Sequence, residues 1–144
     1  MFKNIFKKSV KKNDSQTNIL IASLLVHGAR IDDNYTNIER EIVKKALLNL
    51  NLAETNEVEK LLKEAEEKEK NSNQIIEFTK EIKKKSMEFR LKIIEMLWKI
   101  VYSDGSSDNY ESNLIRRVCG LLYIPDSESG KIKLKIIDSL KIDK

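Results

Sequence analysis

Three carboxylates lie within eight residues, in a polar stretch between two apolar segments, and they could bind a cation. They belong to Asp104, Asp108 and Glu111. Together with turn carbonyls, the hydroxyls of Ser106 or Ser107 and water, they could supply about six oxygen ligands. No nitrogen or sulfur ligand lies nearby, so the chemistry favours Ca²⁺, Mg²⁺ or Mn²⁺ over zinc or copper.

The same carboxylates have a second interpretation, as helix caps. Asp108 would be the N-cap of the next helix and Glu111 its N3 partner, while Asp104 would accept hydrogen bonds from loop amides beside Gly105. The two interpretations are compatible, because a carboxylate can cap a turn and still face an ion.

A similar turn lies upstream, in the segment from Gly28 to Glu39. Its positions align pairwise with those of the second turn: Asp32 with Asp104, Thr36 with Asp108, and Glu39 with Glu111. Apolar positions align in the same register without a gap, including Ile21 with Ile93, Leu25 with Leu97, Val43 with Ile115, and Leu50 with Leu122. This self-similarity predicts a duplicated helix–loop–helix unit. Thr36 can cap but brings no carboxylate, so capping accounts for both turns and chelation accounts well only for the second.

The elements that hold these turns are predicted to be helices. The chain has 144 residues, 40% of them hydrophobic, with one proline and four glycines, which is typical of one all-α domain. Apolar spacing predicts seven helices and no strand, in two pseudo-symmetric halves. The predicted helices cover about residues 17–30, 36–50, 54–70, 74–84, 86–103, 108–122 and 126–140. The first and fifth are the most apolar, so we expect them to pair at the centre.

Local patterns add four expectations. Thr36-Asn37-Ile38-Glu39 is a capping-box pattern that should open the second helix. Trp98 should be a core anchor, and His27 a partly exposed residue near a helix end. The charged segment 64–70 of the third helix should be solvated.

The leading segment is basic, and the rest is nearly neutral. We expect residues 1–16 to be a basic tail before a single domain at 17–140. On a helix, Phe2, Ile5 and Phe6 would share one side, so residues 1–15 could contact an anionic membrane surface. A frayed tail, or one docked on its own domain, is the alternative. The net positive charge is concentrated in this tail and the body is nearly neutral, so we expect no nucleic-acid partner.

Several features that the sequence lacks limit the compartment and the chemistry that we expect for this protein. Cys119 is the only cysteine, so an internal disulfide is impossible and a reducing cytoplasm is expected. The leading segment has no continuous apolar region typical of a signal peptide, and no apolar run approaches the ~20 residues of a membrane span. No nucleophile–base pair or phosphate-binding loop occurs, so we predict that the protein is not an enzyme.

The second turn and its flanks resemble the tellurite-resistance TerB-like family. The resemblance rests on the run Ile94–Gly105 followed by Asp108, Tyr110-Glu111 and Leu114–Val118, and it extends over about residues 18–140. It implies a compact fold of about seven helices with a pseudo-symmetric pair of acidic clusters proposed to bind metal ions. It also implies a relation to the N-terminal domain of the DjlA co-chaperone and a link to stress responses, often near the membrane.

Carried over to this chain, the acidic positions are Asp32 and Glu39 in the first turn and Asp104, Asp108 and Glu111 in the second. Asp33 stands where the family has a glycine and Thr36 where it has a second aspartate, so the first turn departs from the pattern. The leading hypothesis is a cytoplasmic, non-enzymatic domain that binds a divalent cation and acts through contacts with a protein partner. The alternative is a metal-independent interaction or membrane-peripheral scaffold whose acidic turns are caps.

Overall fold

A computed structural model describes residues 2–31, 35–72, 74–104 and 109–142, with the side chains of 2–15, 104, 109–112 and 140–142 excepted. This part of the chain is all-α, as predicted, and contains no strand. Its α-helices are α1 (Phe2–Arg30), α2 (Asn37–Asn49), α3 (Val58–Lys70), α4 (Ile76–Thr79), α5 (Met87–Val101), α6 (Asn109–Leu121) and α7 (Asp126–Ile142). Two short 3₁₀ helices, η1 (Ile82–Lys84) and η2 (Tyr102–Asp104), complete the described elements.

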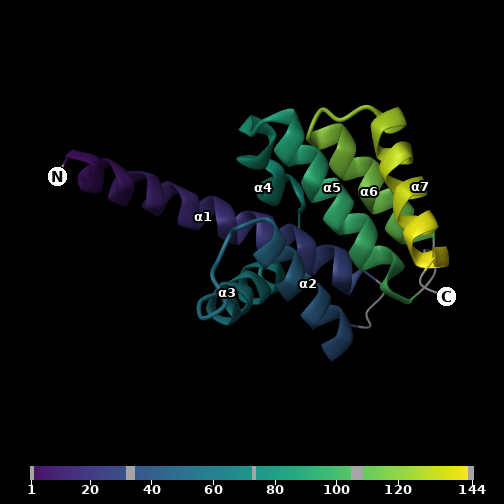
Figure 1. Cartoon of the computed structure of the whole chain (residues 1–144), viewed down its shortest axis with the longest axis horizontal. Coiled ribbons are helices and arrows are strands. Elements are labelled where there is room, and N and C mark those ends of the chain that lie inside the picture. The colour runs from purple at the N-terminus through teal and green to yellow at the C-terminus, as the bar shows by residue number, and fades with distance from the viewer. Residues whose placement is uncertain (1, 32–34, 73, 105–108, 143–144) are drawn as a thin grey trace.

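Helices α1 and α5 form the centre of the molecule, as their composition predicts (Figure 1). Helix α1 contacts α2, α3, α4 and α5, while α5 also contacts α6 and α7. The two cross closely at Gly28, where an added Cβ would lie 2.9 Å from a methyl group of Leu97. Trp98 is 5% exposed, which confirms it as a core residue, and Cys119 is fully buried.

Three helices differ clearly from their predicted extent, and one of them is α3, which begins at Val58 rather than near Glu54. Helix α1 begins at Phe2 rather than near Thr17, so the leading segment continues the first core helix. The fourth predicted helix is divided into α4 and η1, joined by Lys80 and Glu81. None of the described helices combines the length and the apolar character needed to cross a bilayer.

The alignment of the two turns in the sequence reappears in the local geometry. The first residues of α2 and α6 are as far apart in the sequence as the two acidic turns are, and so are their last residues. The two non-glycine residues with positive φ in the described chain, Asn51 (58°) and Tyr123 (57°), have that spacing too. In each case the amide of the following residue donates back to the helix: Leu52 N–H to Leu47 O (3.1 Å) and Ile124 N–H to Cys119 O (2.9 Å). Both helices therefore end in a Schellman-type turn. A superposition of the two halves in space stays a prediction.

Candidate functional site

The five residues predicted to bind metal are described to different extents. Asp32 and Asp108 lie outside the described residues. Asp104 is the last residue of η2 and Glu111 lies on α6, but the side chains of both are outside the described part. Glu39, in the first turn of α2, is described with its side chain. The metal assignment of all five stays a prediction.

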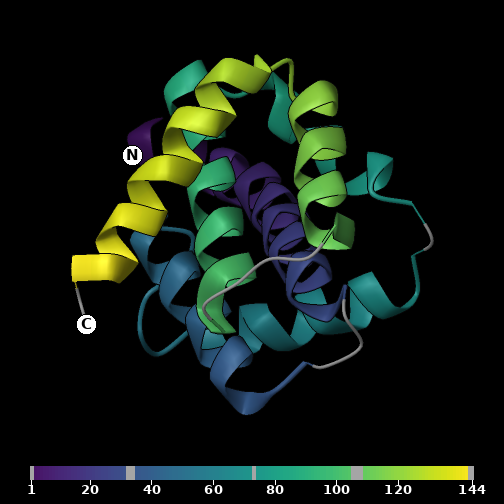
Figure 2. The same ribbon diagram turned by 90° about the vertical axis from the view of Figure 1, so that its right-hand side faces the viewer.

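The helix ends that flank the two acidic turns lie at the same end of the molecule. The last turns of α1 and α5 and the first turns of α2 and α6 lie toward the right-hand side of Figure 1, which is the side that faces the viewer in Figure 2. A shallow hollow of about 420 Å³ lies beside them, lined by Ile31 and by α6 residues that include Arg116 and Arg117. The fold therefore brings the flanks of both turns into one region, although the turns are far apart in the sequence.

Glu39 forms the predicted capping box at the start of α2. The Thr36 hydroxyl accepts a hydrogen bond from Glu39 N–H (3.1 Å), and Glu39 Oε1 accepts one from Thr36 N–H (3.2 Å). The two bonds pair amide groups that a helix N-terminus would otherwise leave unsatisfied. A cation at the first turn would have to share this carboxylate with the cap.

Glu66 is the centre of an ion network that joins the first turn and α2 to α3. Its carboxylate accepts hydrogen bonds from the Tyr35 hydroxyl (2.6 Å) and from Nε and Nη2 of Arg40 (2.8 and 3.2 Å). The other guanidinium nitrogen of Arg40 donates to both oxygens of Glu59 (2.7 and 3.1 Å). Lys44 Nζ lies 3.8 Å from Glu59. One guanidinium thus binds two carboxylates on one face of α3.

Glu69 extends the network to the end of α1. Arg30 Nη1 donates to its Oε1 (2.5 Å), and Nδ1 of His27 lies 3.0 Å from its Oε2. The Arg30 guanidinium also lies over the Tyr35 ring, 4.9 Å from its centroid. His27 is 30% exposed, which confirms its expected position. The expected solvation of segment 64–70 is wrong at two positions, because the side chains of Glu66 and Glu69 are only 17% and 11% exposed.

These contacts move the pKa values of the groups that make them. Burial raises the pKa of the Tyr35 hydroxyl above its ordinary value, and the hydrogen bond to the negative Glu66 raises it further. The hydrogen bond to Glu66 also raises the pKa of Arg40. The neighbouring Arg40 lowers the pKa of the half-exposed Glu59 carboxyl. Arg40 and Glu59 are therefore held in their charged forms at neutral pH, and Tyr35 is a neutral donor.

The carboxylates of this network already have cationic partners, and they form no ion-binding cluster. Among the side chains that the structure describes, no group of three His, Cys, Asp or Glu residues could hold a metal ion. A carboxylate cluster for a cation at the first turn would therefore need residues outside the described part. The network instead fixes the backbone on both sides of that turn, through Arg30 before it and Tyr35 after it.

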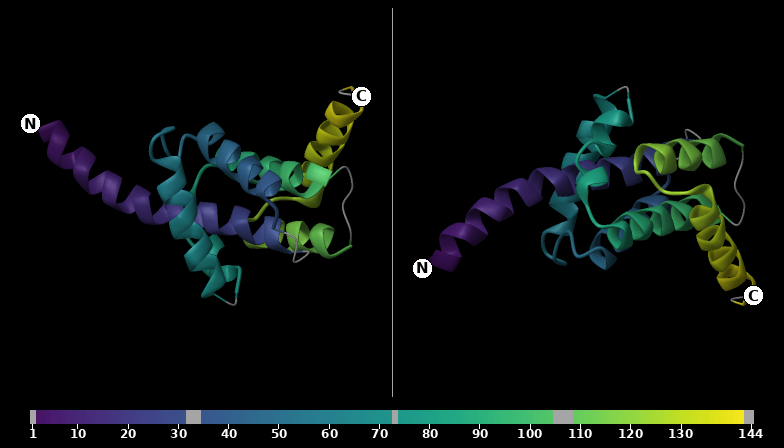
Figure 3. Two further views of the ribbon diagram at one scale, coloured as in Figure 1. Left: turned by 90° about the horizontal axis from the view of Figure 1, so that it is seen from below. Right: turned by 90° about the horizontal axis from the view of Figure 1, so that it is seen from above.

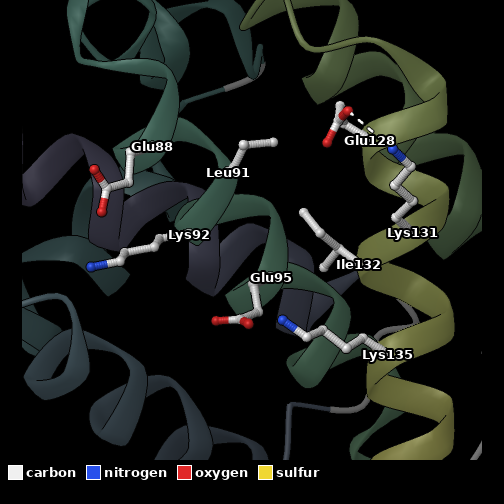
Figure 4. A pocket seen from close by; sticks show the side chains of 8 residues that line it. All are labelled: Glu88, Leu91, Lys92, Glu95, Glu128, Lys131, Ile132 and Lys135. Atoms are coloured by element: carbon white, nitrogen blue, oxygen red, sulfur yellow. Dashed lines mark ion pairs between the residues drawn. The ribbon is translucent and has the colours of Figure 1, made fainter.

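A groove of about 460 Å³ lies between α5 and α7 (Figure 4). Leu91 and Ile132 form its apolar part. Its other lining residues are charged: Glu88, Lys92 and Glu95 from α5, and Glu128, Lys131 and Lys135 from α7. Lys131 pairs with Glu128 at 3.6 Å. These lining residues include no histidine, cysteine or hydroxyl group, so the groove does not contain a Ser–His or Cys–His pair.

Sequence reasoning did not anticipate the network around Glu66. Its pairs join residues 15 to 42 positions apart, whereas helical periodicity relates residues only three or four positions apart. The spacing of the glutamates was one available signal. Glu66 follows Glu59 by seven residues and Glu69 follows Glu66 by three, which places all three along one side of a helix.

The fold defines a small all-α domain. The sequence model of the family described as tellurite resistance protein TerB matches residues 18–134, which is most of the chain. The chain belongs to the TerB family. No curated protein and no solved structure matches it.

Proposed function

We propose that this protein is a non-enzymatic TerB domain of the cytoplasm, which binds a divalent cation at its second acidic turn and reports the bound state through contacts with a protein partner. The observation that carries the proposal is the spacing of Asp104, Asp108 and Glu111, in a chain that belongs to the TerB family. Oxygen ligands of this kind select a hard cation, so Ca²⁺, Mg²⁺ and Mn²⁺ are the candidates.

The second turn is a better candidate than the first. It contains three carboxylates, whereas the first turn has Thr36 in the position of Asp108. Glu39, the acid of the first turn that the structure describes, is already engaged in the capping box. We therefore assign the cation to Asp104, Asp108 and Glu111, with Asp32 and Glu39 as weaker candidates for a second ion.

Supporting observations bear on the compartment and on the stress-response role. The single cysteine is buried, which suits a reducing cytoplasm. The family's name connects it with tellurite resistance, and we extend that connection to a role of this domain in stress response.

Calorimetric titration of the full chain with Ca²⁺, Mg²⁺ and Mn²⁺ tests the proposal. We expect saturable heat with at least one ion, and loss of that heat in Asp104→Asn/Asp108→Asn. The matched control is Glu54→Gln/Asp138→Asn, which removes the same charge at two exposed positions and should bind as wild type does. Saturating ion should also raise the melting temperature of the wild type and the control, because a ligand that binds only the native state stabilises it.

The competing function is a metal-independent interaction scaffold whose acidic turns act only as caps. The capping box of Thr36 and Glu39 favours it, since the same arrangement can serve Asp108 and Glu111. In that case no ion gives heat. Asp104→Asn/Asp108→Asn then changes the melting temperature little, because asparagine caps a helix about as well as aspartate, while Asp108→Ala lowers the unfolding free energy by about 1 kcal/mol. This combination of results would reject cation binding.

A further inference from the structure

The amino-terminal half of α1 extends beyond the body of the molecule. Helix α1 is continuous from Phe2 to Arg30. In the part of the helix whose side chains are described, Gln16 is exposed and the buried residues begin at Ile21. Figures 1 and 3 show no other described element beside this half in any of the views. At 1.5 Å per residue, the part of the helix before Gln16 extends roughly 20 Å. The fold therefore provides a helical arm, residues 2–15, with no described neighbour from its own chain.

The sequence of this arm divides into an apolar and a basic side. The apolar residues of the arm have the spacing of one helix face. Ile5 follows Phe2 by three residues, Phe6 is the next residue, and Val10 follows Phe6 by four residues. The lysines centre on the opposite side of a 3.6-residue period and flank the apolar face: Lys3, Lys7, Lys8, Lys11 and Lys12. A helix with this division suits a boundary between an apolar and an anionic phase.

The positive charge of the protein is concentrated in the same arm. All five lysines precede Asp14, the first acidic residue, so the remainder of the chain has 22 of the 27 basic residues against 23 acidic ones. The body is thus close to neutral, and attraction to an anionic surface must act mainly on the arm. Each lysine near such a surface contributes about 1 kcal/mol of attraction.

We propose that residues 2–12 of α1 dock on an anionic lipid surface, with Phe2, Ile5 and Phe6 entering the boundary of the acyl chains and the lysines contacting the phosphate headgroups. The apolar side of the arm favours a bilayer over a nucleic acid, because that side would stay in water if the arm bound a nucleic acid. The lysines argue against a second copy of the arm, because two such segments would bring ten like charges together. Three or four apolar residues bind a bilayer weakly by themselves, so docking depends both on their insertion and on the attraction of the lysines to the headgroups.

The continuity of α1 gives this docking a structural consequence. The helix that carries the arm also carries the core residues Ile21, Leu24 and Leu25, which are fully buried. No loop separates the two parts, so a docked arm holds the body close to the bilayer in a restricted range of orientations. Docking thereby places the whole domain, with its acidic turns, at the membrane.

Co-sedimentation of the full chain with vesicles tests the proposal, in buffer with a chelator so that no divalent cation contributes. We expect binding to phosphatidylcholine vesicles that contain phosphatidylserine, and little binding to phosphatidylcholine alone. Lys7→Gln/Lys8→Gln should lower the partition coefficient roughly 30-fold, because two lysine contacts are lost. Phe2→Ser/Phe6→Ser should lower it by at least tenfold on the same vesicles.

The matched control is Lys83→Gln/Lys84→Gln, which removes the same charge from two exposed lysines of η1 and should change partition less than threefold. Thermal melting of each variant by circular dichroism should match the wild type, so that lost binding reflects the arm and not unfolding. The chelator makes the result independent of the cation proposal.

Three results would overturn the proposal. One is no binding of the wild type to either vesicle, and another is equal binding by the wild type and both arm variants. The third is dimerisation of the wild type in light scattering, abolished by Phe2→Ser/Phe6→Ser, without vesicle binding. That last result would assign the apolar side to a second copy of this chain.

Discussion

Arg40 is the residue on which the described ion network depends most. Its guanidinium donates hydrogen bonds to Glu59 and Glu66 at once, and its side chain is only 22% exposed. A planar guanidinium can bind two carboxylates with fixed geometry, whereas a lysine ammonium is a single point charge. Arg40 therefore holds α2 against α3 in a defined register.

Replacing Arg40 by methionine should lower the unfolding free energy by about 2 kcal/mol, because Glu66 is left partly buried without its main cation. Urea denaturation measures the change. Adding Glu66→Gln to this variant should recover part of the loss, since the uncompensated charge is removed. The matched control is Lys84→Met, which breaks the exposed pair of Lys84 with Glu81 and should cost less than about 0.5 kcal/mol. Equal losses in the two single variants would contradict a structural role for the network.

At the scale of elements, the central packing of α1 on α5 depends on a close approach. A Cβ at Gly28 would lie 2.9 Å from the buried Leu97 side chain, whereas one at Gly120, on α6, meets nothing within 4 Å. Both glycines lie in helices, where glycine disfavours the helical state relative to alanine. The same substitution should therefore have opposite effects at the two sites.

Gly28→Ala should lower the unfolding free energy by about 1 kcal/mol, because overpacking outweighs the gain in helix propensity. Gly120→Ala should raise it by about 0.5–1 kcal/mol, since only the propensity term acts there. Thermal and urea unfolding of the two variants beside the wild type give both values. Stabilisation by both substitutions would show that Leu97 moves aside without cost, and that the approach of α1 to α5 is not tightly packed.

At the scale of the whole molecule, one core joins all seven helical segments that the sequence predicts. The buried residues form a single apolar cluster that extends from Ile21 on α1 to Ile136 on α7. Helices α1 and α5 contact elements from both helix–loop–helix units. Neither unit can therefore lose its structure without exposing the core of the other.

Unfolding should accordingly be a single cooperative transition. Trp98 is the only tryptophan and is buried on α5, so its fluorescence reports the central packing, while circular dichroism reports helix content. We expect the two probes to give the same midpoint in urea. Separate midpoints would show that the two units unfold independently.

The sequence by itself determined the helices and the turns between them. Apolar residues spaced three or four apart and the capping box at Thr36 are local features, and they predict most of the helices. The start of α1 at Phe2 was missed, because the leading segment lacks the apolar spacing of the core helix. The alignment of the two acidic turns likewise anticipated that α2 and α6 would have corresponding bounds. The division of the fourth helix was missed because apolar spacing does not distinguish an α-helix from a shorter helix with a 3₁₀ turn.

The tertiary structure decided which charges are solvated and which are paired. Glu66 and Glu69 lie in a segment that is almost entirely charged, yet they are paired in the fold. Arg30 from α1, Arg40 from α2 and Tyr35, which precedes α2, are their partners. The sequence holds these partners 26 to 39 residues away, and no local rule relates positions at that distance. The acidic turns were readable as candidate ion sites because their residues lie close together in the sequence, whereas the ion network exists only once three helices have packed.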